Sequence, residues 1–263
     1  MPAAGPEGSD ASRDAFAAAV RAPEVDLADA CLLVAADFDE QLAPPGARAA
    51  WLTVLAELAA AVPVHGTPAE RLRTALQGFA GTARDYDQLE SSLLHEVLRR
   101  RRGLPILLSV VWLEVARRAG IPAYGLGLPG HFVVGVPAHA GRDDVLDVVD
   151  AFGGGAVLTR LAAAEAPVWG PVETVERILA NIRRWAERPD RLDVRRKALE
   201  LTLLLPRHSA TVRREYGEVL VQVGRFAEGA AELEAFADAV EPVADDEAER
   251  VRWAARAARA RLN

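Results

Sequence analysis

The stretch "LPILLSVVWLEVARRAG", residues 104–120, constrains the fold of this chain more than any other segment. From Ile106 to Leu113 it is apolar on every side of a helix except at Ser109. A proline stands in its first turn and a glycine at its end, as at natural helix boundaries. Because a helix that is apolar all round is stable only when it is buried, we predict a central core helix here.

The sequence pattern changes directly after this helix. Three short segments follow, "IPAYGLGL" (121–128), "HFVVGV" (131–136) and "DDVLDVVD" (143–150). They are rich in β-branched residues and separated by glycine and proline turns, which is typical of strands. Since short connections favour antiparallel pairing, we predict a small antiparallel sheet of about three strands beside the central helix.

The chain before the central helix is predicted to be helical. Residues 1–10 are small, rich in proline and glycine, and expected to be disordered. Amphipathic patterns predict helices over residues 25–40, 43–62, 67–81 and 87–103. Thr67 and Glu70 have the spacing of a capping box at one helix start, and Gly103 is expected to end the last of these helices.

The chain after the sheet is predicted to be helical again, from residue 170 onward. Residues 211–242, "TVRREYGEVLVQVGRFAEGAAELEAFADAVEP", have the glycine, phenylalanine and proline spacing of a degenerate tetratricopeptide unit. Gly229 and Phe236 stand where small alanines are usual in such a unit. A further helix over residues 245–262 is expected to cap the stack. We therefore predict a helical repeat module over residues 171–263.

Composition limits the classes of function. The formal net charge of −7 argues against binding to nucleic acid or to an anionic membrane. The single cysteine, Cys31, excludes an intrachain disulfide and a cysteine-based zinc cluster, and it lies on an apolar helical stripe where a buried side chain is expected. The N-terminus has no signal-peptide pattern and no segment is long and apolar enough to span a membrane, so we expect a cytoplasmic protein.

Three local motifs do not carry the function that they suggest. "GLGLPG" (125–130) has the glycines of a dinucleotide-binding loop, but a strand pattern follows it where a helix is needed. "HEVLR" (95–99) lacks the second histidine of a zinc protease motif. "RRRR" (99–102) is expected to complement the dipole at the end of a helix. We predict neither a cofactor nor a metal.

One pair of residues does suggest chemistry. His131 opens the second predicted strand, and Asp150 closes the third just before three glycines. A histidine base with an aspartate that orients it is half of a catalytic triad. The missing part of such a triad is a nucleophile.

Several segments of the chain resemble the SirB1 family, in which a transglutaminase-like (papain-like) domain precedes tetratricopeptide repeats. The resemblance extends over residues 25–262 and is carried by "SSLLHEVL" (91–98), "GLPILL" (103–108), "PGHF" (129–132), "DAFGGG" (150–155) and "GRFAEGAAELEAF" (224–236). Leu107, Ala151 and Gly154 depart from the residues that are usual in the family.

The resemblance implies a catalytic role for His131 and Asp150 and places the family's cysteine nucleophile at or beside Pro105. Neither Pro105 nor Ile106 carries a nucleophilic group, and the hydroxyl of Ser109 lies one turn too deep in the helix. We therefore expect a vestigial dyad without a nucleophile. The cleft beside it is predicted to be lined by Ser109, Trp112, Gly130 and Gly153.

The sequence thus predicts a mostly helical α+β protein, with a transglutaminase-like core (about 85–165) inside a first domain (11–167) and the repeat module after it. Two functions remain open. The first is a non-catalytic adaptor (a pseudoenzyme) whose repeats bind a protein or peptide partner. The second is an amide- or peptide-processing hydrolase or transferase that uses His131 and Asp150 with water or an unusual nucleophile. The identity of the partner and the oligomeric state do not follow from the sequence.

Overall fold

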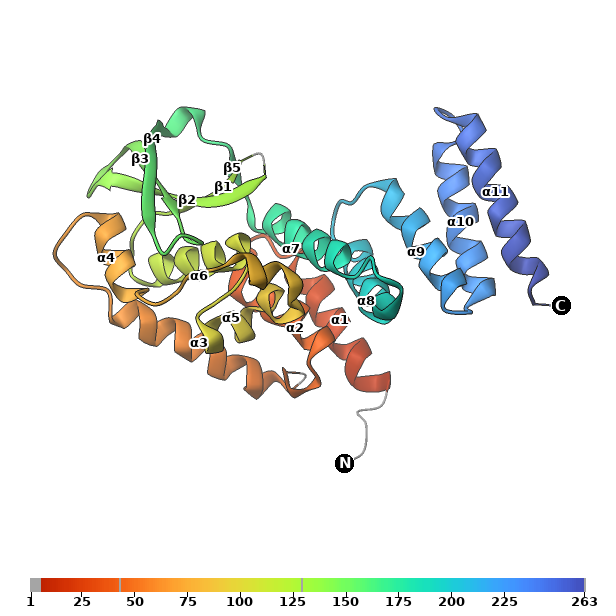
Figure 1. Cartoon of the computed structure of the whole chain (residues 1–263), viewed down its shortest axis with the longest axis horizontal. Coiled ribbons are helices and arrows are strands. Elements are labelled where there is room, and N and C mark those ends of the chain that lie inside the picture. The colour runs from red at the N-terminus through yellow and green to blue at the C-terminus, as the bar shows by residue number, and fades with distance from the viewer. Residues whose placement is uncertain (1–5, 43, 129, 263) are drawn as a thin grey trace. The chain divides into compact units, whose positions relative to one another are not determined.

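The computed structural model describes residues 6–42, 44–128 and 130–262. The chain forms two compact units, Met1–Ile178 and Leu179–Asn263. The units divide inside helix α7 (Pro171–Trp185), whereas the sequence suggests a boundary between residues 167 and 171. Figure 1 shows α7 as one continuous helix.

The first unit contains most of the predicted helices. Its α-helices before α7 are α1 (Pro6–Ala19), α2 (Leu27–Phe38), α3 (Pro45–Ala60), α4 (Pro68–Ala75), α5 (Leu94–Arg100) and α6 (Pro105–Arg118). Short 3₁₀ helices lie between them and near the sheet: η1 (Glu40–Leu42), η2 (Ala83–Asp87), η3 (Leu89–Ser92) and η4 (Ala163–Glu165). The unit is mainly helical, as the sequence predicts.

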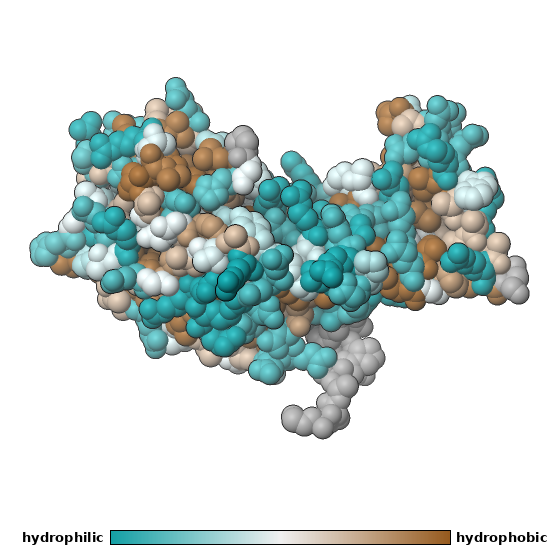
Figure 2. All heavy atoms as spheres, in the orientation of Figure 1, coloured by the Kyte–Doolittle hydropathy of each residue, from teal (hydrophilic) through white to brown (hydrophobic). Residues whose placement is uncertain are grey.

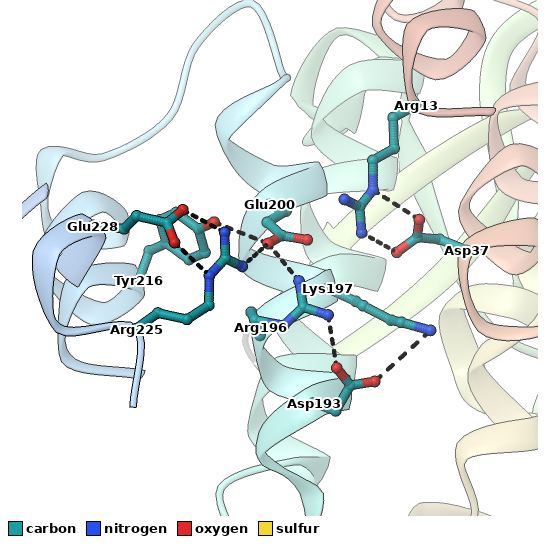
Figure 3. Close-up of polar contacts among 9 residues, drawn as sticks. All are labelled: Arg13, Asp37, Asp193, Arg196, Lys197, Glu200, Tyr216, Arg225 and Glu228. Carbon is teal, nitrogen blue, oxygen red and sulfur yellow. Dashed lines mark hydrogen bonds and ion pairs between the residues drawn. The ribbon is translucent and has the colours of Figure 1, made fainter. Parts of the chain in front are cut away.

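Local signals account for the starts of these helices. The capping box at the start of α4 is confirmed, since Thr67 accepts a hydrogen bond from the Glu70 N–H at 3.3 Å and Glu70 accepts one from the Thr67 N–H at 2.9 Å. Residues 6–10 differ from the expectation of disorder because they form the first part of α1, and residues 1–5 lie outside the described residues. A bidentate ion pair between Arg13 and Asp37, with distances of 2.9 and 3.1 Å, joins α1 to α2 (Figure 3).

The helix predicted over residues 87–103 is shorter than expected. A 3₁₀ turn occupies its first part, and α5 ends at Arg100 because Arg101 adopts a left-handed conformation with φ of 54°. Gly103 has another role, since a Cβ atom there would lie 2.5 Å from Cγ2 of Val97. The missing side chain lets the chain turn back tightly, so that the Leu104 N–H donates to the Ser91 carbonyl at 2.9 Å.

The prediction of a buried central helix is confirmed by α6. Its apolar residues from Ile106 to Trp112 are all at most 2% exposed. Strands β1 and β2 pack on one side of α6, and helices α2, α3 and α5 pack around the rest of it (Figure 1). Burial of this kind stabilises the fold by about 1.5–3 kcal/mol for each large apolar side chain.

The sheet is antiparallel, as predicted, but has five strands instead of three. The strands are β1 (Tyr124–Leu128), β2 (His131–His139), β3 (Arg142–Asp150), β4 (Ala156–Ala162) and β5 (Val168–Trp169), in the order β4-β3-β2-β1-β5. The two additional strands are the edge strands. β5 has only two residues, which are too few to show a sequence pattern. β4 is exposed along almost its whole length, so it lacks the alternation of buried apolar and exposed polar residues that predicts a strand. Apolar surface gathers over the sheet in Figure 2, where Val157, Leu158 and Val168 are exposed.

The second unit continues from α7 with a 3₁₀ turn and four α-helices: η5 (Pro189–Arg191), α8 (Leu192–Leu203), α9 (Ala210–Gln222), α10 (Phe226–Val240) and α11 (Asp245–Ala260). Consecutive helices from α8 to α11 pack on one another. Two glycines allow α9 and α10 to approach closely, because a Cβ atom at Gly217 would lie 3.0 Å from the carbonyl oxygen of Gly229. The predicted helix pair is therefore present.

A polar network around Glu200 joins three of these helices (Figure 3). Its Oε1 atom accepts hydrogen bonds from Arg196 at 2.6 Å and from the Tyr216 hydroxyl at 2.8 Å. Arg225, just before α10, lies 3.8 Å from the same oxygen and also pairs with Glu228. The network links α8, α9 and the start of α10.

Arginines of the "RRRR" segment hold a buried carboxylate in the first unit. Asp85 is fully buried and accepts hydrogen bonds from the Thr82 N–H at 2.7 Å and from Arg102 at 3.1 Å, while Arg100 lies 3.6 Å away. Burial by itself would raise the pKa of Asp85, but the hydrogen bonds from Arg102 and Thr82 outweigh it and hold this pKa below its usual value. The segment therefore anchors the loop that precedes α5.

We predict that Asp85→Asn destabilises the protein by about 2–4 kcal/mol at pH 7, since it leaves two arginines without their carboxylate. Because the folded-state pKa is lowered, the stabilisation is present above the unfolded pKa of about 3.9 and is lost as the pH falls through the folded value. In urea unfolding followed by circular dichroism, the difference in unfolding free energy between wild type and Asp85→Asn should become smaller as the pH falls into the acid range. Asp144→Asn, at an exposed ion pair, is the control and should change stability by about 0.5 kcal/mol or less. A gap that is independent of pH would contradict this.

Candidate functional site

His131 and Asp150 lie together at one end of the sheet. Nε2 of His131 is 3.2 Å from Oδ1 of Asp150, and the same oxygen accepts a hydrogen bond from the Phe152 N–H at 3.0 Å. The histidine side chain is 30% exposed and the aspartate side chain 18%. The carboxylate is thus held by the backbone of the turn, while the imidazole ring can be reached from solvent. With Nε2 directed at the carboxylate, Nδ1 is the nitrogen available to a bound group.

Glycine turns place both residues. Gly130 precedes His131 with φ of +74° and has open space where a side chain would stand. After Asp150, the Gly155 N–H donates to the Asp150 carbonyl at 2.8 Å in a left-handed turn. A Cβ atom at Gly153 would lie 2.7 Å from Oδ2 of Asp150, so the absence of a side chain there leaves room for the carboxylate. The run of three glycines is a local requirement of the site.

The start of α6 lies close to the same end of the sheet. The buried Ser109 hydroxyl donates to the carbonyl of Phe132, the residue after His131, at 3.4 Å. The Gly81 N–H donates to the Phe152 carbonyl at 2.9 Å. A Cβ atom at Gly81 would lie 2.0 Å from the ring of Phe152 and 2.7 Å from the carbonyl oxygen of Gly103. These contacts bring the residues before α6 next to the end of β3.

Pro105 occupies the first turn of α6 and is buried. This is the position to which the resemblance assigns the nucleophile. The three residues that follow, Ile106 to Leu108, are buried and aliphatic. No thiol, hydroxyl or amine is present on the side chains from Pro105 to Leu108.

Cys31, the only cysteine of the chain, does not replace the missing group. It lies on α2, is 2% exposed, and is buried as the sequence predicts. Burial raises the pKa of its thiol, and the negative charges of Glu114 and Asp26 raise it further. The thiol therefore stays protonated and unreactive at neutral pH.

The four residues predicted to line the cleft fall into two groups. Gly130 and Gly153 lie in the turns beside the dyad. Ser109 and Trp112 are at most 1% exposed and belong to the core. The indole ring of Trp112 packs below Gly155, where a Cβ atom would lie 2.6 Å from Cζ2. Contact of either side chain with a ligand stays a prediction that the present structure does not test.

Two aromatic residues near the dyad were not identified from the sequence. Tyr86, in η2, and Phe152 pack edge to face, with ring centroids 5.9 Å apart. Tyr86 is 53% exposed, and partial burial together with the charge of Asp150 raises the pKa of its hydroxyl. Phe152 lies within "DAFGGG", one of the segments that carry the family resemblance. No sequence signal connects Tyr86 to a strand end that lies 64 residues further on. The pair forms an aromatic surface near the carboxylate of Asp150.

A cavity of about 750 Å³ lies elsewhere in the first unit, between the segment before α2, the C-terminal half of α6 and strands β1 and β5. Neither His131 nor Asp150 lines it. A smaller pocket of about 360 Å³ reaches the glycine turn at Gly154 from the side of α4. Because the large cavity has no contact with the dyad, its volume says nothing about the ligand of the dyad.

Two kinds of feature are not found among the described residues. No group of three or more His, Cys, Asp or Glu side chains there is arranged to hold a metal ion. In the same part of the chain, no helix combines the length and apolar character that are needed to cross a bilayer.

The small sheet against a buried helix, with a His–Asp pair at the helix start, agrees with the comparison with known families. Residues 50–183 match the transglutaminase-like superfamily, and the chain belongs to it. The match covers the whole sheet, α6 and both residues of the dyad.

Several known proteins are similar to part of this chain. A UPF0162 protein of Xylella fastidiosa is 40% identical over 107 residues, which are 40% of this chain and 37% of that protein. A UPF0162 protein of Pseudomonas aeruginosa is 33% identical over 126 residues, 46% of each chain. The F-box only protein 21 of Mus musculus is 38% identical over 85 residues, 31% of this chain and 14% of that protein. The chain thus spans less than half the length of these relatives. No solved structure matches it.

We predict that Gly81→Ala destabilises the protein by about 1–3 kcal/mol, because the new methyl group overlaps the Phe152 ring and the Gly103 carbonyl. Gly46→Ala is the matched control. Gly46 lies in α3 with nothing within 4 Å of a Cβ atom, so alanine should stabilise this helix by about 0.5–1 kcal/mol. Unfolding free energies in urea measure both changes, and equal effects of the two variants would contradict the close packing at Gly81.

Proposed function

We propose that this chain is a non-catalytic member of the transglutaminase-like superfamily, in which the core binds an amide or peptide group and the C-terminal helices bind a protein or peptide partner. One observation carries the proposal. His131 and Asp150 form a hydrogen-bonded pair, and a buried proline, Pro105, occupies the position on α6 to which the resemblance assigns the nucleophile. The dyad is assembled, but the group that it would activate is absent.

The energetics of catalysis favour binding over turnover. Acyl transfer at such a site needs a nucleophile whose proton the histidine removes. A general base that acts alone contributes about 10²–10⁴ in rate, whereas enzymes accelerate reactions by about 10⁶ or more. The difference is several kcal/mol of transition-state stabilisation. The side chain of Pro105 has no nucleophilic atom and the thiol of Cys31 is buried, so neither residue supplies this stabilisation.

The same groups are suited to holding a planar polar ligand. The Nδ1 atom of His131 can exchange a hydrogen bond with an amide, and the rings of Tyr86 and Phe152 provide apolar faces near the carboxylate of Asp150. A histidine locked by Asp150 keeps one orientation, which lowers the entropy that binding costs. These features support a binding cleft at the dyad.

The helices of the second unit support the second half of the proposal. The close crossing of α9 and α10 at Gly217 and Gly229 fits the helix pair of a tetratricopeptide unit. Stacked units of this kind form concave surfaces that bind peptides or partner helices. The partner role of these helices, the SirB1-type repeat assignment and a cytoplasmic location are parts of this proposal.

Amide hydrolysis is the second candidate. The solvent-exposed imidazole beside an ordered carboxylate favours it, because a water molecule on Nδ1 would be in position for general-base catalysis. Such an enzyme would depend on Asp150 for the correct tautomer of His131. The absence of a side-chain nucleophile on the first turn of α6 argues against it.

We predict that Pro105→Cys creates a reactive thiol that wild type lacks. At the start of α6 and near His131, its pKa should fall below the usual value of about 8.5, since the helix dipole and an imidazolium both stabilise a thiolate. The rate of alkylation by iodoacetamide from pH 5 to pH 9, followed by intact mass, measures this pKa. Adding His131→Ala should slow labelling at pH 6 by about 10-fold or more.

Wild type and Leu108→Cys are the controls. The buried Cys31 should stay unlabelled in the native protein, and a cysteine at position 108, one turn deeper in α6, should not respond to His131→Ala. A thiol at position 105 whose rate is the same with and without His131 would contradict the assignment of Pro105 to the nucleophile position.

A further inference from the structure

Helix α11 has one face that the second unit does not cover. Ala248, Val251, Ala255 and Ala258 are buried against α10. On the other side Trp253 is 68% exposed, near the middle of the helix. Its exposed neighbours Arg250 and Arg256 are charged, so the indole is a large apolar group on an otherwise polar face.

The charges of α11 are separated along its length. All of its acidic residues lie between Asp245 and Glu249, and its arginines begin at Arg250 and continue beyond its end. Some of these residues already pair within the unit: Glu247 with Arg214, Arg252 with Asp238 and Glu241, and Arg259 with Glu234. Those pairs tie α11 to α9 and α10.

A second group of charged residues on α11 lies around Trp253. Asp246, Glu249, Arg250 and Arg256 are exposed and form no ion pair within the described part of the chain. Together with Arg252 and Trp253 they line a groove of about 500 Å³. Along this face, which we call the Trp253 face, Asp246 and Glu249 lie nearest the start of α11, Arg250 and Arg252 lie between them and Trp253, and Arg256 lies beyond Trp253.

We propose that the Trp253 face binds a second copy of the same chain, with the two α11 helices antiparallel about a twofold axis near Trp253. Glu249 and Arg256 lie equally far from the midpoint of α11, on opposite sides of it. In the antiparallel pair, Glu249 of one copy therefore faces Arg256 of the other copy, and this contact occurs twice. Asp246 and Glu249 of each helix then face the stretch from Arg256 to Arg259 of the other, and both tryptophans lie close to the axis.

Charge complementarity makes a second copy the best-suited occupant. A purely acidic partner would be repelled by Asp246 and Glu249, and a purely basic one by Arg250 and Arg256. A surface that carries both signs can place opposite charges against Glu249 and Arg256, and a second α11 in the antiparallel direction does so. Since one helix pair buries a small interface, the dimer should be weak, with a Kd in the micromolar range.

Sedimentation equilibrium of the full chain tests the proposal. Wild type should dimerise between about 1 µM and 0.3 mM. Trp253→Ala and Arg256→Glu should each raise Kd by about 10-fold or more, the first by loss of the apolar centre and the second by placing like charges together. Arg207→Glu, at an exposed arginine in the segment between α8 and α9, makes the same change of net charge and should leave Kd unchanged.

Exchange of charges distinguishes the twofold contact from any other. Arg256→Glu and Glu249→Arg should each dimerise more weakly than wild type when alone, but should associate about as tightly as wild type when mixed, because each then supplies the opposite charge at both contacts. The double variant Glu249→Arg with Arg256→Glu should dimerise again by itself. A wild type that stays monomeric to about 0.3 mM, or single variants that do not associate when mixed, would overturn the proposal.

Discussion

The burial of α6 is the constraint on which the first unit depends. The fully buried side chains Leu107, Val110 and Val111 leave the first half of this helix no face for solvent, so the sheet and the helices α2, α3 and α5 must surround it. The sheet can cover α6 only when β1 and β2 lie along it, and this fixes where β2 begins and where β3 ends. The positions of His131 and Asp150 are therefore a consequence of how the core is covered.

Local hydrogen bonds hold the His131–Asp150 pair. Asp150 accepts a hydrogen bond from the Phe152 N–H, and its carbonyl closes the glycine turn at Gly155. These bonds need no nucleophile, because they belong to the turn itself. Pro105 is also compatible with the first turn of a helix, because the backbone N–H groups of this turn have no partner within the helix. The structure is thus stable with a histidine–aspartate pair that has no group to activate.

Features that depend on local signals could be predicted from the sequence. The capping box of Thr67 and Glu70, the all-apolar α6 and the positions of His131 and Asp150 at strand ends are of this kind. Features that depend on distant contacts could not. The edge strands β4 and β5 form because they pair with β3 and β1, respectively. The aromatic pair of Tyr86 and Phe152 joins two segments that are far apart in the sequence. The early end of α5 likewise follows from a turn that packs on Val97.

The central claim is that an assembled His–Asp pair in this superfamily member serves binding and not turnover. The most direct measurement compares wild type with Asp150→Asn for hydrolysis and acyl transfer on a panel of peptide and amide substrates, with product formation followed by mass spectrometry. Our account predicts that neither protein shows turnover above the buffer blank. Turnover by wild type that falls by about 10²-fold or more in Asp150→Asn would contradict it, because only a working base depends on that carboxylate.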